Sequence, residues 1–132
     1  NQKKKIDVDL LRNKKKKFLF VYLIKYKNQI ILMKRRNTKF LNGLMEIPNN
    51  LLNNKTPLKI VKKKAPLELD WRIVPGKMYS KISNFELEIK FLEAQTKEKI
   101  FLKNSIWVKK NDIQKIPIST LMKNILSYLN PV

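Results

Sequence analysis

The spacing of hydrophobic and polar positions changes along the chain, and each spacing predicts a different element. Residues 18–26 (FLFVYLIKY) are almost continuously apolar, which is typical of a central strand buried on both faces. Residues 85–91 alternate between apolar odd and charged even positions, which predicts a half-buried antiparallel strand. Over 118–129 the apolar residues recur at helical spacing behind Ser119 or Thr120, which predicts a capped amphipathic helix.

Shorter patterns complete the predicted fold. Apolar runs predict further strands over 30–34, 44–47, 77–82, 100–102 and 106–108. The Asn-rich residues 49–57 are expected to form a loop, and 58–64 one or two helical turns that end before Pro66. The sequence therefore predicts the α+β class, with a mixed or antiparallel sheet and a C-terminal amphipathic helix.

At 132 residues the chain is expected to hold one domain, over 18–132. Residues 1–17 are strongly basic and show little periodicity, so we expect a linker or leader. It would tether the domain to an upstream one, with a stand-alone protein as the alternative. No apolar run approaches the roughly 20 residues of a membrane span, and a signal peptide is lacking. We therefore expect a soluble protein of the bacterial cytoplasm that associates with the nucleoid.

The charge points to a polyanionic partner such as nucleic acid. The formal net charge is +20, from 30 basic and 10 acidic residues. Only four of the basic residues are Arg, and Lys, Asn and Ile are abundant, so an AT-rich coding sequence accounts for part of this excess. The chain has no Cys and no His, which excludes disulfides, thiol nucleophiles, iron–sulfur ligation and imidazole catalysis.

The acids of a phosphate-cleaving site are missing from their expected positions. A magnesium site of the Nudix type needs glutamates on one helix face, in the pattern G-x5-E-x7-R-E-U-x-E-E-x-G-U, where U is aliphatic. With the pattern anchored at Asn50, acidic positions fall on Thr56 and Ala65, and only Glu68 matches. Pro66 stands inside the helix, at a cost of about 3 kcal/mol. The sequence thus predicts a degenerate Nudix helix without a metal site.

Three blocks carry a resemblance to a known family. They read ILMKRRNTKFLNGLMEIP, KISNFELEI and WVKKNDIQKIPISTLMKNIL. In order and spacing they resemble the C-terminal, Nudix-like domain of the adenine DNA glycosylase MutY, over about residues 18–130. That domain recognises 8-oxoguanine opposite adenine. The resemblance implies a partner, double-stranded DNA that contains 8-oxoguanine:adenine, and a function in base excision repair.

The resemblance also implies which residues read the lesion. In the family an F-S-H loop reaches the oxidised guanine, and the matching positions here are Ile82, Ser83 and Asn84. A serine hydroxyl both donates and accepts, so Ser83 can answer the donor at N7 and the acceptor at O8. Ile82 replaces the family's Phe as an apolar wedge, and Asn84 replaces its His. Phosphate contacts are expected from Arg35, Arg36, Lys39 and Lys81.

The family's chemistry belongs to a separate N-terminal glycosylase domain of the same chain. That domain carries an iron–sulfur cluster and a helix-hairpin-helix motif. This sequence has no Cys for the cluster and only Gly43 and Gly76 for the motif, so we expect neither in it. We therefore expect no catalysis and no cofactor in this domain alone.

Other interpretations are open at this point. Residues 82–84 would also suit an ordinary turn, and the basic loop 34–39 a solvated one. A degenerate Nudix-fold protein would bind or hydrolyse a nucleoside diphosphate derivative, with Glu46 or Glu68 as its acid. A general RNA-binding β-domain is disfavoured, because residues 85–91 present acids and not aromatic side chains on their polar face.

Overall fold

The computed structural model describes residues 15–34 and 44–130. Its strands are β1 (Lys16–Tyr26), β2 (Gln29–Lys34), β3 (Met45–Glu46), β4 (Asn49–Leu52), β5 (Arg72–Ile82), β6 (Phe85–Gln95) and β7 (Ser105–Lys109). Its helices are α2 (Leu58–Lys63), the 3-10 helix η1 (Lys110–Lys115) and α3 (Thr120–Leu129). The sheet has seven strands in the order β3-β2-β1-β6-β5, while β4 also pairs with β1 and β7 with β2. The predicted α+β class is confirmed.

The central strand β1 is buried on both faces, as predicted. It runs parallel to β6, from Lys16 opposite Glu86 to Lys25 opposite Gln95, and antiparallel to β2 and β4. Residues 18–24 are all buried. The strand begins at Lys16, within the residues that the sequence assigned to the linker.

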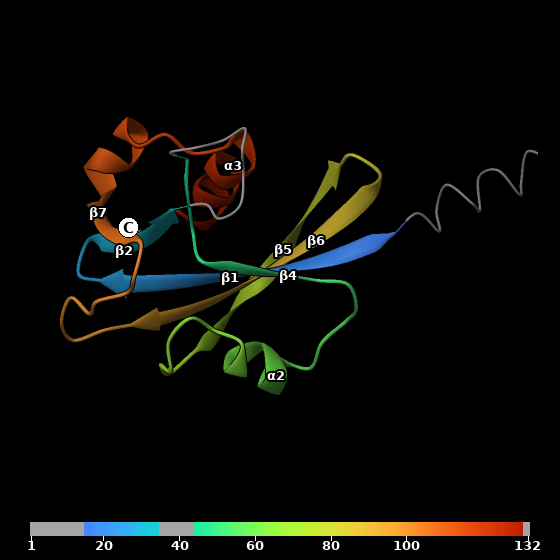
Figure 1. Cartoon of the computed structure of the whole chain (residues 1–132), viewed down its shortest axis with the longest axis horizontal. Helices are drawn as coiled ribbons and strands as arrows, with labels where there is room; N and C mark the ends of the chain where they lie inside the picture. Colours follow the sequence, from blue (N-terminus) through green and yellow to red (C-terminus); the bar gives the residue numbers. More distant parts are fainter. Residues whose placement is uncertain (1–14, 35–43, 131–132) are drawn as a thin grey trace, which may run out of the picture.

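Each face of β1 contributes to a separate core, and a helix covers each one (Figure 1). Leu19, Val21 and Leu23 pack with α3, whereas Phe18, Phe20, Tyr22 and Ile24 pack on the side of α2 and Trp71. On the α2 side, the hydroxyl of Tyr22 donates a hydrogen bond of 2.7 Å to the Val61 carbonyl oxygen and accepts one of 3.2 Å from Asn50. Burial raises the pKa of Tyr22, although the Asn50 hydrogen bond opposes that shift.

Two predictions about the strands are wrong. Residues 49–52 form β4 and not a loop, because they pair with β1 from Phe18–Leu52 to Val21–Asn49. Asparagine is uncommon in strands, so the sequence did not indicate this one, which forms because it pairs with β1. Residues 100–102 are not a strand, and lie in the connection between β6 and β7.

Other elements are longer than predicted or agree closely. β5 starts at Arg72 and not at 77, and its register shifts between Val74 and Met78, around Gly76 at a φ of 94°. α2 ends at Lys63, before Pro66, as predicted. Ser119 caps α3 by accepting a hydrogen bond of 3.2 Å from the Met122 N–H. Among the described residues, no helix is long and apolar enough to cross a membrane.

Candidate nucleic-acid interface

The predicted lesion-reading residues form the tip of the β5–β6 hairpin. Ile82 pairs with Phe85, so Ser83 and Asn84 make a two-residue turn, and both are exposed. Ser83 has a φ of 52°, in the left-handed region that costs a residue with a Cβ about 1–2 kcal/mol. Ile82 is half-buried against the α3-side core, so its side chain is only partly available as a wedge.

Basic side chains flank this tip on both faces of the hairpin. Lys81 is exposed and pairs with Glu86 across the two strands. The Lys17 ammonium lies 4.5 Å from the centroid of the Phe85 ring. Arg35, Arg36 and Lys39, the other predicted phosphate contacts, lie outside the described residues.

A cleft of about 460 Å³ opens beside the tip, between the hairpin and the start of α3. Its lining is mainly apolar, and Glu46, Asn49, Ser119 and Thr120 contribute its polar atoms. Ile82 and Phe85 form one wall. An apolar pocket with a few polar groups is the usual form of a site for a planar organic ligand.

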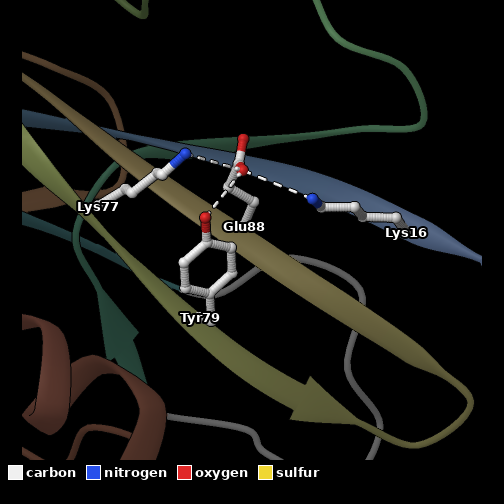
Figure 2. A network of polar contacts seen from close by, with 4 residues as sticks. All are labelled: Lys16, Lys77, Tyr79 and Glu88. Atoms are coloured by element: carbon white, nitrogen blue, oxygen red, sulfur yellow. Dashed lines mark hydrogen bonds and ion pairs between the residues drawn. The ribbon is translucent and has the colours of Figure 1, made fainter. Parts of the chain in front are cut away.

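A carboxylate with three polar partners lies on the other face of the hairpin (Figure 2). The Glu88 side chain is only 5% exposed, and its Oε1 lies 3.6 Å from Lys16 Nζ and 3.5 Å from Lys77 Nζ. The Tyr79 hydroxyl donates a hydrogen bond of 3.4 Å to the same oxygen. The register of the strands explains why these side chains lie close together. Tyr79 faces Glu88 across the β5–β6 ladder, and Lys16 comes from the neighbouring strand β1.

Electrostatics keep this carboxylate ionised. Burial by itself raises the pKa of Glu88, but the charges of Lys16, Lys77 and Lys90 together outweigh it, so the pKa is lowered from its usual 4.5. The pKa of Lys77 is raised, first by its hydrogen bond with Tyr79 and then by the charge of Glu88. Sequence reasoning missed Lys16, Lys77 and Tyr79, because the register that unites them cannot be read from local periodicity.

In the part of the chain that the structure describes, the acids are not grouped as a metal site requires. Within residues 15–34 and 44–130, no group of three or more His, Cys, Asp or Glu is placed to hold a metal ion. Glu46 lines the cleft beside the hairpin tip, whereas Glu68 lines a different one, with Lys62, Lys63 and Trp71. The described acids therefore do not fit the magnesium ions of a Nudix hydrolase.

Comparison with known proteins agrees with this architecture. A family model described as NUDIX domain matches residues 19–128. No curated protein matches the chain.

Several solved structures share this fold. The C-terminal domain of mouse MUTYH, from a complex with human PCNA, is 16% identical with a TM-score of 0.64, over 86% of this chain and 87% of that one. The MutT protein from Methanosarcina mazei Go1 is 12% identical with a TM-score of 0.64, over 91% and 99%. The NUDIX domain of Shewanella oneidensis NrtR, complexed with ADP ribose, is 12% identical with a TM-score of 0.62, over 94% and 96%. At these identities the likeness establishes the fold alone.

Proposed function

The chain belongs to the NUDIX domain family, and we propose that it is the DNA-binding recognition domain of an A/G-specific adenine DNA glycosylase. In this role it reads 8-oxoguanine opposite adenine in double-stranded DNA. Its partner in the same polypeptide would be an N-terminal glycosylase domain, which carries the catalytic chemistry and the iron–sulfur cluster. This domain itself would supply recognition without catalysis.

The observation that carries the proposal is the hairpin tip. Ser83 is exposed there, in a left-handed conformation that is unfavourable for a residue with a Cβ. Backbone strain of this kind is frequent at functional sites. Lys17 and Lys81 flank the tip and can contact phosphates, which position a protein on DNA without reading sequence. The fold shared with the C-terminal domain of mouse MUTYH is consistent with this role.

The direct test is substitution of the proposed reading residue. We expect Ser83→Ala to reduce the preference for an 8-oxoguanine:adenine duplex over a guanine:adenine duplex by about fivefold or more, because a good base contact is worth about 1–3 kcal/mol. Fluorescence anisotropy with labelled duplexes measures both affinities at one salt concentration. Ser127→Ala, at an exposed serine on α3, is the matched control and should leave the preference unchanged. Equal loss of affinity for both duplexes would contradict the role of Ser83.

The cleft beside the tip favours a second candidate function, binding of a nucleoside diphosphate derivative. Its volume and apolar lining suit a nucleobase, and the NrtR domain of the same fold is complexed with ADP ribose. Saturable binding of ADP ribose by calorimetry, abolished by Thr120→Trp at the cleft, would support this function over lesion recognition. Lack of binding by the unaltered protein would remove it. Hydrolysis is not part of this candidate, since Glu46 and Glu68 lie in different clefts.

A further inference from the structure

We propose that Tyr79, Lys16 and Lys77 form a binding site for an unpaired nucleotide, in which the Tyr79 ring stacks on the base and the two ammonium groups contact neighbouring phosphates. The site goes beyond the proposed lesion turn. It lies on the side of the hairpin opposite the cleft and needs neither an oxidised base nor a duplex.

The aromatic ring is presented to solvent at the open end of the sheet. Tyr79 is 59% exposed although it lies within β5 and pairs with Glu88 of β6. On the same side of the sheet, α2 and Trp71 cover β1 further along, where Tyr22 is fully buried. In Figure 1 the hairpin extends past α2, so none of the helices that the structure describes covers its outer end on this side. Exposed tyrosines on a sheet are the usual platform for stacking bases.

Two cations are held beside this ring in advance of any ligand. The ammonium groups of Lys16 and Lys77 lie 5.8 and 5.6 Å from the ring centroid. Both reach the same Glu88 oxygen from opposite sides, with the Tyr79 hydroxyl between them (Figure 2). A shared carboxylate restricts the two flexible lysines, so less conformational entropy is lost when they bind an anion.

The exposed charge of the cluster is positive. The lysine side chains are 43% and 46% exposed, whereas Glu88 is 5% exposed beneath them. An incoming anion therefore meets the ammonium groups of Lys16 and Lys77 first. Lys81 lies two rungs further along the hairpin, opposite the exposed Glu86. An aromatic ring flanked by cations fits a nucleotide chain, which offers a π-face and a phosphate at each unit.

This arrangement bears on the RNA-binding β-domain that the sequence disfavoured. The alternating strand at 85–91 places acids on its polar side, and the sequence showed no aromatic residue among them. The structure supplies the ring from the adjacent strand β5 and buries Glu88 beneath two lysines. On the polar side of β6, Glu88 therefore supports the basic aromatic site, whereas Glu86 stays exposed next to Lys81.

The test uses single-stranded DNA and removes the ring without removing charge. We expect Tyr79→Ala to weaken binding of a fluorescein-labelled oligo(dT) by about tenfold, since base–aromatic stacking contributes about 1–3 kcal/mol per base. Tyr79→Phe keeps the ring and should bind within about twofold of the unaltered protein. Phe101→Ala removes an aromatic side chain that is 86% exposed elsewhere, and is the matched control. An abasic oligonucleotide of equal length should bind the Tyr79→Ala and unaltered proteins alike.

The contribution of the lysines is measured separately, through the salt dependence of binding. Lys77→Gln should weaken binding of both oligonucleotides and lower the slope of log affinity against log salt by about 0.7, the value for one phosphate contact on a single strand. Unchanged slopes would remove Lys77 from the site. Circular dichroism of each variant confirms that the fold is retained.

Several outcomes would overturn the proposal. The first is that the unaltered protein does not bind oligo(dT). The second is that Tyr79→Ala loses equal affinity for normal and abasic oligonucleotides. The third is that Tyr79→Ala weakens binding of polyglutamate, a polyanion without bases, more than binding of oligo(dT). The proposed lesion turn is tested independently, because Ser83→Ala should change the duplex preference and leave oligo(dT) binding intact. Failure of one site therefore does not imply failure of the other.

Discussion

At the scale of single residues, Ser83 combines a structural cost with a proposed function. It shares its left-handed conformation with Lys27, which occupies the corresponding position of the β1–β2 turn. Two-residue hairpins favour Gly, Asn or Asp where φ is positive. The sequence left residues 82–84 open between a lesion-reading loop and an ordinary turn. A positive φ at Ser83 could not be read from it, because serine has no strong preference for that region.

Substitution of Ser83 and Lys27 by glycine distinguishes an effect on stability from an effect on lesion recognition. We expect Ser83→Gly and Lys27→Gly each to raise the free energy of unfolding by up to about 1 kcal/mol, because glycine adopts positive φ without a steric cost. Urea unfolding measures this change. Only Ser83→Gly should also reduce the preference for the 8-oxoguanine duplex. If it stabilised the protein and left the preference intact, Ser83 would be a turn residue and no more.

Glu88 links one residue to the pH dependence of the whole fold. Its pKa is lowered in the folded protein, so its contribution to stability is present above its usual pKa of 4.5 and is lost as the pH falls through the lower folded value. The free energy of unfolding of Glu88→Gln should therefore fall less between neutral and acid pH than that of the unaltered protein. Glu86→Gln, an exposed acid on the same strand, is the control. Equal acid dependence of the Glu88→Gln and unaltered proteins would contradict the assignment.

At the scale of elements, the sequence predicted those with one clear period. The continuous apolar run of β1, the alternation of β6 and the helical stripe of α3 were recognised because each pattern reflects the burial of that element alone. The predicted antiparallel orientation of β6 is right only for its pairing with β5, since β6 runs parallel to β1. β4 was missed, because its pairing with β1 and not its own composition makes it a strand. The Tyr79 site was missed for a related reason. Lys77 and Tyr79 lie on β5 and Lys16 on β1, and both strands pair with β6, whose Glu88 joins them.

The irregular part of β5 lies against Tyr128 of α3 at Gly76. Gly76 sits in the shifted register at a φ of 94°, and an added Cβ would collide with the hydroxyl of Tyr128. Tyr128 also stacks on Phe91, with ring centroids 5.2 Å apart. We expect Gly76→Ala to lower the free energy of unfolding by about 1–3 kcal/mol, which thermal or urea unfolding can measure.

A double variant divides that loss into its two causes. Tyr128→Phe removes the colliding hydroxyl, so the Gly76→Ala loss measured in that background should be smaller, with the backbone strain remaining. If the loss were the same in both backgrounds, the collision would play no part. If Gly76→Ala caused no loss at all, the strained conformation itself would be contradicted.

At the scale of the whole molecule, the charge of +20 and the NUDIX domain fold together define the account. The charge provides an attraction to nucleic acid that weakens with salt and carries no sequence information. Specificity has to come from defined sites on the fold. The hairpin tip is the proposed site for a damaged duplex, and the Tyr79 face the proposed site for an unpaired strand. The net charge was evident from the sequence. Which basic residues lie at each of these two sites depends on strand pairing.

The most direct test of the central claim is the ratio of two dissociation constants of the unaltered protein. One is measured on a duplex with 8-oxoguanine opposite adenine, the other on the same duplex with guanine opposite adenine, at identical salt. We predict tighter binding of the oxidised duplex, by about fivefold or more, with the two affinities falling in parallel as salt increases. A ratio of one at every salt concentration would contradict lesion recognition and leave a basic NUDIX domain without base specificity.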